Sequence, residues 1–254
     1  VRRLSHRAAD SEMRLDWNRR QDGAAVALLI LLVVGFTWRI GLAGRVLAGG
    51  DVFSYFYPYW SEATRAIRAL RLPGWNAYLF MGVPFAANSQ VGFFYPLNWP
   101  LWLLFPPERS VHISIVVHLC LAAVTAYAWG RRSLGQERLG AWATGAAYAL
   151  GGYLSAQVEH VNQLQGLAWL PLMLMLGGEI GHAADAEVGV GSDIPERSGR
   201  TGLLTRRRVK AAVGLATVIG LVLLAGHTQT AFIALLGTAV YAALRMTVLA
   251  FGSD

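Results

Sequence analysis

The chain has 254 residues, of which 55% are hydrophobic and only 15% charged, and its formal net charge is +7. With a mean hydropathy of +0.41, this balance excludes an ordinary soluble domain and is typical of a membrane protein with several spans. The basic residues stand at the ends of apolar segments, so the positive charge does not indicate nucleic-acid binding.

The apolar segments predict an all-α, polytopic transmembrane helix bundle of about six spans, because one span needs about 20 mostly apolar residues. In chain order the predicted spans are residues 24–47, 111–129, 140–156, 164–180, 211–225 and 230–251. The third and fifth are short or rich in glycine, and Pro171 predicts a kink in the fourth. Residues 1–23 form an N-terminal region, and residues 24–254 form the membrane domain.

The basic residues predict how the bundle is oriented, since cytoplasmic loops of membrane proteins carry an excess of lysine and arginine. Three basic clusters lie before the first span, after the second and before the fifth. Their members are Arg2, Arg3, Arg7, Arg14, Arg19, Arg20, Arg131, Arg132, Arg138, Arg206, Arg207, Arg208 and Lys210. A cytoplasmic N-terminus places all three clusters on the cytoplasmic side. The first apolar run is expected to remain as an uncleaved anchor.

Two connections are long. The cytoplasmic loop 182–208 mixes small and charged residues, which is typical of a flexible connector. The outer loop 48–110 is rich in aromatic residues and proline, and its residues 59–71 have helical periodicity. The apolar face of that segment comprises Trp60, Ala63, Ile67 and Leu70. Its basic face comprises Arg65, Arg68 and Arg71. Such a segment is expected to lie in the membrane interface.

Polar residues gather at the predicted outer face. Asp51 follows Gly49 and Gly50 where the first span ends, and it precedes a run of aromatic residues. The two shorter outer turns contribute Glu159, His160, Asn162, His227 and Gln229. This concentration at one membrane face indicates a site of chemistry or binding there.

Four segments, taken together and in this order, carry a family resemblance. They are GGDVFSYFYPYW, GWNAYLFMGVPFAANSQVGFFYPLNWP, HVNQLQGLAWLPLML and GHTQTAF, and they extend over residues 49–232. Together they resemble the bacterial YfhO-type membrane proteins, a family assigned to the GT-C class of polytopic glycosyltransferases.

The resemblance implies a GT-C-like layout, with a catalytic acidic residue just after the first span and interfacial helices in the first outer loop. Such enzymes take a sugar from a polyprenyl-phosphate carrier and pass it to a glycan, lipid or protein acceptor of the cell envelope. A multi-pass location in a bacterial cell membrane is implied. Because the class commonly has more spans, the chain is expected to be an N-terminal fragment or a truncated member.

Asp51 is the predicted catalytic carboxylate, because a base must remove the proton of the acceptor hydroxyl. The alternative is a turn residue at a helix end. The predicted substrate-binding residues are Tyr55, Tyr59, Trp75, Asn76, Gln90, Glu159, His160, His227 and Gln229. For the polar members among them, the alternative is that they satisfy backbone groups of folded loops.

Arg39, Arg65 and Arg68 are predicted to bind the lipid phosphate, because a guanidinium pairs with phosphate through two hydrogen bonds. The alternatives are contact with ordinary membrane lipid headgroups and, for Arg39, snorkelling to the interface. Glu159, His160 and His227 include residue types that bind zinc, but no zinc motif is present. No metal site is predicted, and a divalent-cation cofactor is left open.

Two other function classes stay open. A transporter or flippase for a lipid-linked sugar would place polar groups near the middle of the membrane, in paired broken helices. Here the polar residues lie at one face, which favours the enzyme. The other class is a non-catalytic membrane scaffold left by truncation.

Overall fold

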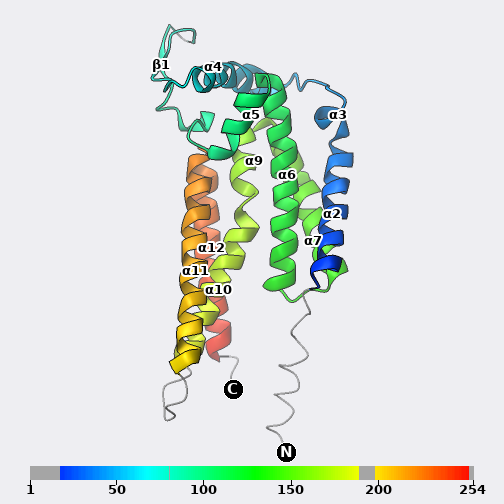
Figure 1. The fold of residues 1–254 in the computed structure, drawn as a ribbon, viewed down its shortest axis with the longest axis vertical. Coiled ribbons are helices and arrows are strands. Elements are labelled where there is room, and N and C mark those ends of the chain that lie inside the picture. Colours follow the sequence, from blue (N-terminus) through cyan, green and yellow to red (C-terminus); the bar gives the residue numbers. More distant parts are fainter. Residues whose placement is uncertain (1–17, 80, 189–197, 252–254) are drawn as a thin grey trace, which may run out of the picture.

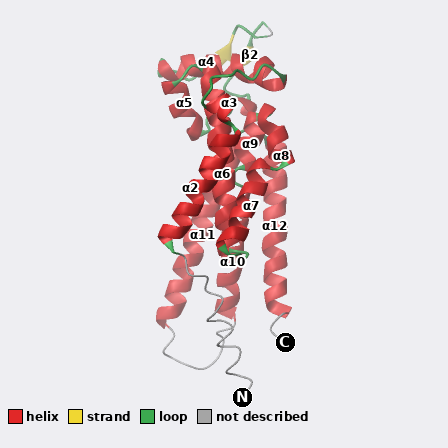
Figure 2. Ribbon diagram, turned by 90° about the vertical axis from the view of Figure 1, so that its right-hand side faces the viewer, coloured by secondary structure: helices red, strands yellow, loops and turns green. Residues whose placement is uncertain are grey.

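A computed structural model describes residues 18–79, 81–188 and 198–251 of the protein, and these residues are mostly helical (Figure 1). The predicted all-α class is thereby confirmed. The long helices are α2 (Arg19–Phe36), α6 (Pro107–Arg132), α7 (Arg138–Leu150), α10 (Leu170–Val188), α11 (Ser198–Leu224) and α12 (Thr228–Phe251). They run alongside one another, and shorter helices cover one end of the bundle (Figures 1 and 2).

Within the described part of the chain, three helical segments are long and apolar enough to cross a membrane: Pro107–Arg132, Val161–Gly181 and Thr228–Thr247. They correspond to the second, fourth and sixth predicted spans. The first two are 61% buried within the protein but the third only 22%, so α12 presents most of its surface outward. α6 is central, because it packs against α2, α7, α9 (Val161–Leu167) and α10.

The boundaries predicted for the first span are wrong. α2 starts at Arg19, where Asn18 Oδ1 accepts hydrogen bonds from the backbone N–H groups of Arg20 and Gln21, and it ends at Phe36. At its end the Thr37 hydroxyl donates to the carbonyl of Val33 at 2.8 Å, and such a back-bond bends a helix. The chain then forms the short α3 (Trp38–Gly41) and an irregular stretch. Residues 42–47 are therefore not helical.

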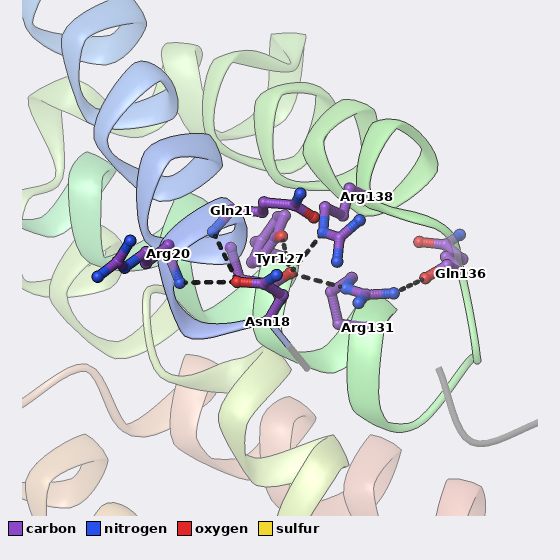
Figure 3. A network of polar contacts seen from close by, with 8 residues as sticks. Asn18, Arg20, Gln21, Tyr127, Arg131, Gln136 and Arg138 are labelled. Carbon is purple, nitrogen blue, oxygen red and sulfur yellow. Dashed lines mark hydrogen bonds and ion pairs between the residues drawn. The ribbon is translucent and has the colours of Figure 1, made fainter. Parts of the chain in front are cut away.

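A buried ionic network fastens the start of α2 to its neighbours (Figure 3). Asp22 is 1% exposed, and its Oδ1 accepts hydrogen bonds from the Tyr127 hydroxyl at 2.5 Å and from Nε of Arg131 at 3.0 Å. Nε of Arg138 lies 3.8 Å from the same oxygen. The network thus joins α2 to the end of α6 and the beginning of α7. Losing one member of such a buried pair is strongly destabilising.

The other predicted connections and breaks have mixed outcomes. The predicted loop 182–208 is wrong where the structure describes it, because α10 continues to Val188 and α11 begins at Ser198. Residues 189–197 lie outside the described residues, as do Arg2, Arg3, Arg7 and Arg14. The predicted kink is confirmed, since α9 and α10 are separated at residues 168–169, just before Pro171.

The third predicted span is also interrupted. α7 ends at Leu150, Gly151 is extended, and the chain continues as α8 (Gly152–Ala156) and the 3-10 turn η4 (Gln157–Glu159). An extended residue cannot continue the helical hydrogen-bond ladder, so the helix stops there. The break matters because it places Glu159 and His160 in a turn at the end of the bundle.

The outer loop 48–110 is a folded unit with its own short elements. After the π-helical turn η1 (Val52–Phe56) comes α4 (Tyr57–Arg68), which lies across the end of the bundle (Figures 1 and 2). The remaining elements are β1 (Trp75–Asn76), β2 (Val83–Pro84), η2 (Ser89–Val91), η3 (Pro96–Asn98) and α5 (Trp99–Leu104). β1 and β2 pair antiparallel, with Trp75 opposite Pro84.

The predicted helix 59–71 is confirmed with shifted ends. Trp60 and Ala63 are buried as expected, but Leu70 is 92% exposed and has a left-handed backbone with φ of 52°, so it does not belong to the apolar face. Beneath α4, the rings of Trp60 and Trp102 meet edge to face with centroids 5.4 Å apart. The buried aromatic residues of this loop belong to the same hydrophobic core as Leu29 and Leu119 of the bundle.

Candidate functional site

Asp51 and His160 lie together at the end of the bundle that α4 covers. Asp51 Oδ2 is 3.5 Å from His160 Nε2, and the two side chains are 54% and 47% exposed. Asp51 precedes the η1 turn, but its carboxylate accepts no capping hydrogen bond from the described backbone of that turn. This geometry argues against the turn-residue alternative, because the carboxylate faces an imidazole instead of the helix end.

Glu159 joins the same cluster by lying over the glycine turn. Gly50 has a φ of 52°, and a Cβ at this position would collide with the Glu159 carboxylate. A Cβ at Gly49 would meet Oε1 of Glu159 at 3.5 Å, an ordinary contact. Glycine is therefore required mainly at position 50, where the backbone has a positive φ and the Glu159 carboxylate approaches closely. The result is that two carboxylates and one imidazole surround a single turn.

A buried pair behind this turn holds the chain that leads to Asp51. The Tyr57 hydroxyl donates to the carbonyl of Leu47 at 2.9 Å, and it lies 2.8 Å from Nε2 of the buried His112. Burial, followed by the negative charge of Glu108, raises the pKa of Tyr57 to about 12, so the hydroxyl stays protonated at neutral pH. Sequence reasoning did not find His112. Its signal was a histidine within an apolar run.

His227 occupies the turn between α11 and α12. Its Nδ1 accepts a hydrogen bond from the backbone N–H of Thr230 at 3.1 Å and lies 2.7 Å from the Thr230 hydroxyl, which makes it the N-cap of α12. Burial, and secondly the charge of His160, lowers the pKa of His227. His227 thus lies within electrostatic range of His160, but its ring also caps the beginning of α12.

The turn before α12 packs against the outer loop. Gly226 has a φ of 89°, and a Cβ there would run into the backbone carbonyl of Ser89. The GHTQT and AANSQ segments, more than a hundred residues apart, are therefore in contact. Gln90 and Gln229 are both exposed at this contact region.

A buried polar network, which the sequence did not predict, docks the outer loop onto the bundle. Its members are Tyr95, Asn98, Ser114, His118, Gln165 and Trp169. Nε2 of Gln165 donates to Asn98 at 2.7 Å and to Ser114 at 3.0 Å. The Tyr95 hydroxyl lies 2.9 Å from His118 Nε2 and accepts a hydrogen bond from the Trp169 indole at 2.9 Å. Satisfied buried networks of this kind make an arrangement rigid and unique.

Two of the predicted sugar-binding tyrosines pack within the outer loop. Tyr59 is buried between the rings of Tyr55 and Phe85, whose centroids are 4.3 and 5.8 Å from its own. Tyr55 is half-buried and donates a hydrogen bond to Asn88 at 3.0 Å. Burial raises the pKa of Tyr55. A ring covered on both faces cannot stack on a sugar, so Tyr59 supports the fold of the loop.

Trp75 and Asn76 differ in exposure although they are adjacent. Asn76 is buried, and its Oδ1 accepts a hydrogen bond from the backbone N–H of Tyr78 at 3.0 Å, which is a loop-stabilising turn. Trp75 is exposed, and its indole lies over Gly82. Trp75 therefore remains a predicted contact for substrate, whereas Asn76 satisfies a backbone group of the folded loop.

The arginines of α4 have protein partners. Glu62 is buried and pairs with Arg65 at 2.9 Å and with Arg71 at 2.6 Å. Arg68 donates to the backbone carbonyls of Trp102 at 2.9 Å and Phe105 at 2.7 Å. Arg68 thereby ties α4 to α5. Arg65 and Arg68, the two residues of this helix that were predicted to bind phosphate, therefore both make contacts within the outer loop.

Arg39 has a different setting. It is exposed in α3, and its guanidinium lies 5.9 Å from the ring centroid of Trp38. It also borders a cavity of about 210 Å³ in the side of the bundle. The lining residues are Phe36, Thr37, Arg39, Ile40, Leu119, Ser155 and Val158. Val158 directly precedes Glu159 and His160, so this mostly apolar cavity reaches the turn that carries these two residues.

The arrangement can supply a base, hydrogen-bond donors and one cation beside an apolar cavity. Among the described residues, no three His, Cys, Asp or Glu side chains are grouped so that they could hold a metal ion. Comparisons of the chain with protein-family models, with curated proteins and with solved structures found no match.

Proposed function

We propose that the protein is an integral membrane glycosyltransferase of GT-C type, which transfers a sugar from a polyprenyl-phosphate donor to an acceptor on the outer face of a bacterial cell membrane. The observation that carries the proposal is the Asp51–His160 pair, half-exposed at one end of an apolar bundle, whereas the basic start of α2 and the basic end of α6 lie at the other end (Figure 1). In this proposal α2, α6, α7 with α8, α9 with α10, α11 and α12 form six spans in a YfhO-like layout.

The contacts between distant segments support the proposal. Each of the four segments that carry the family resemblance contacts another at this end of the bundle. The GGD turn meets Glu159 and His160, the YPLNWP segment bonds to Gln165 and Trp169, and Gly226 packs on Ser89. Contacts of this kind are expected if the segments build one site.

In the proposed reaction Asp51 is the general base. Its carboxylate takes the proton of an acceptor hydroxyl, the hydroxyl oxygen forms a bond to the anomeric carbon, and the bond from that carbon to the carrier phosphate oxygen breaks. The leaving phosphate keeps the electron pair. His160 holds the carboxylate in place through the 3.5 Å contact.

Arg39 is the proposed partner of the phosphate. It combines exposure with a position on the rim of the apolar cavity, where a prenyl chain can lie beside it. A guanidinium stabilises the charge that develops on a leaving phosphate. Arg65 and Arg68 are weaker candidates, because their hydrogen bonds and ion pairs within the outer loop already hold them.

The test is transfer of a labelled sugar from polyprenyl-phosphate donors in reconstituted membranes. Asp51→Asn is expected to lower the rate by about 10²–10⁴-fold, the usual contribution of a general base. Glu108→Gln is the control, because Glu108 is an exposed carboxylate in the first turn of α6 at the same end of the bundle. This variant should leave transfer unchanged.

Equal transfer by Asp51→Asn and the unaltered chain would refute the assignment of the base and make Glu159 the next carboxylate to test. No transfer by any variant, with the unaltered chain folded, would refute an independent enzyme. Uptake of the lipid-linked sugar without transfer would favour the transporter.

A further inference from the structure

A second lateral groove lies between α2 and α7, at the end of the bundle away from α4. Its volume is about 390 Å³, and it is lined by Ala25, Leu28, Arg138, Leu139 and Trp142. This volume falls within the range of roughly 300–1,000 Å³ that ligand sites occupy. Apart from Arg138, every lining residue is aliphatic or aromatic. The groove is separate from the Asp51–His160 pair and from the cavity beside Arg39.

The groove has a charged side chain, Arg138, at one end and apolar side chains along the rest of its length. Arg138 is the first residue of α7, and its side chain is 39% exposed while its Nε faces Asp22 (Figure 3). Leu28 is 61% and Leu139 78% exposed, so the floor opens sideways. In a membrane this side faces the hydrocarbon of the lipid. A ligand that fits is therefore polar at the helix end and apolar along the helices.

The local charge selects an anionic ligand. Where α6 ends and α7 begins, next to Asp22, three arginines accompany two carboxylates in the described residues: Arg131, Arg132 and Arg138 with Asp22 and Glu137. Oδ1 of Asp22 accepts hydrogen bonds from Tyr127 and Arg131. Basic pockets between helices on the cytoplasmic side of membrane proteins bind anionic lipid headgroups.

We propose that the α2–α7 groove binds an anionic phospholipid. Its acyl chain lies along Leu28, Leu139 and Trp142, and its phosphate accepts hydrogen bonds from the guanidinium of Arg138, whose planar fork suits phosphate. The lipid thereby bridges α2 and α7 at the point where the Asp22 network already joins them. The inference rests on the proposed membrane location, and it does not depend on glycosyl transfer.

The experiment is native mass spectrometry of the purified full chain in a neutral detergent, with either dioleoyl phosphatidylglycerol or dioleoyl phosphatidylcholine added. The unaltered chain is expected to retain phosphatidylglycerol about tenfold better than phosphatidylcholine, because only the former is anionic. Arg138→Gln is expected to abolish the preference. Arg20→Gln removes an exposed arginine at the start of α2, outside the groove, and should retain it.

Because Arg138 also faces Asp22, a second variant separates lipid binding from folding. Leu28→Trp fills the groove from its exposed side and leaves the ionic network intact. It should lose the phosphatidylglycerol while keeping its thermal stability without lipid. The proposal would be overturned if the unaltered chain retained both lipids equally. It would also be overturned if Arg20→Gln reduced the preference for phosphatidylglycerol as much as Arg138→Gln does, or if Leu28→Trp retained phosphatidylglycerol fully. No readout involves a sugar, so failed transfer leaves this result unaffected.

Discussion

At the scale of single residues, the candidate site depends on how closely Glu159 approaches the glycine turn. Gly50 adopts a left-handed backbone directly under the Glu159 carboxylate, and Asp51 follows it with its own carboxylate turned toward His160. Two carboxylates can approach one turn only because no side chain stands between them. The geometry of the pair is therefore set by the residue that precedes the proposed base.

Replacing this glycine tests the arrangement. Gly50→Ala is expected to destabilise the protein by about 1–3 kcal/mol, because alanine is strained at positive φ and its Cβ displaces Glu159. Gly49→Ala is the matched control and should be close to neutral, since its Cβ makes only an ordinary contact. Unfolding in detergent measures both variants. Equal stability of the two would contradict the close approach.

The buried amide of Gln165 allows a second test at this scale. Gln165→Leu leaves the Asn98 and Ser114 oxygens without their donor, and the expected loss of stability is about 1–3 kcal/mol. Gln163→Leu, two residues away, removes an exposed hydrogen bond to Tyr153 and should change stability by less than about 0.5 kcal/mol. Thermal unfolding in detergent separates the two. A neutral Gln165→Leu would show that the network does not dock the loop.

At the scale of elements, the beginning of α12 depends on the protonation of one side chain. His227 Nδ1 must be unprotonated to accept the N–H of Thr230, and the pKa of His227 is lowered by burial and by His160. The folded protein therefore binds this proton less readily than the unfolded chain. The stability that the cap provides is complete above about pH 6.5 and is lost as the pH falls below that value.

Hydrogen exchange tests this dependence. Protection of the first turn of α12, corrected for the intrinsic effect of pH on exchange, should fall between pH 7.5 and pH 5. His227→Asn should remove most of the change, because asparagine is a good N-cap that does not titrate. A pH dependence that persists in this variant would assign it to another group, His160 being the next one to replace.

Two other elements show how local breaks position the site. α2 ends where Thr37 bonds back to Val33, and α7 ends where Gly151 becomes extended. Both breaks lie toward the end of the bundle that carries Asp51. Because these helices end early, the following residues form α3 and the η4 turn, and Arg39, Ile40 and Val158 from these two elements line the 210 Å³ cavity. The site is built from helix ends and turns, supported by the long central α6.

At the scale of the whole molecule, the proposed orientation predicts which ends are accessible. In a chain whose one cysteine, Cys120, is changed to serine, Ala77→Cys in the outer loop should react with a membrane-impermeant maleimide added to intact cells. Leu134→Cys, in the turn after α6, should react only after the cells are permeabilised. Both positions are exposed. Reversed labelling would invert the topology, and labelling of both in intact cells would refute a closed membrane crossing between them.

The sequence determined the features that depend on composition and on neighbours along the chain. The apolar runs of α6 and α12, the interfacial helix around Trp60, and the break before Pro171 follow from hydropathy, periodicity and the missing proline N–H. Asp51, Glu159 and His160 could be placed at one face, because turns between consecutive spans alternate between the two faces. These are local or one-dimensional properties, so one sequence is enough to read them.

Only the tertiary structure decided which of these residues meet. Asp51 faces His160, whereas Tyr59 is enclosed by other rings and Arg65 is paired with Glu62. The ends of α2 and α7, and the partners of Gln165, depend on contacts between segments far apart in the chain. An isolated sequence does not specify these distances, because burial and hydrogen bonding at each position are set by the packing of α6 against its neighbours and of the outer loop upon them.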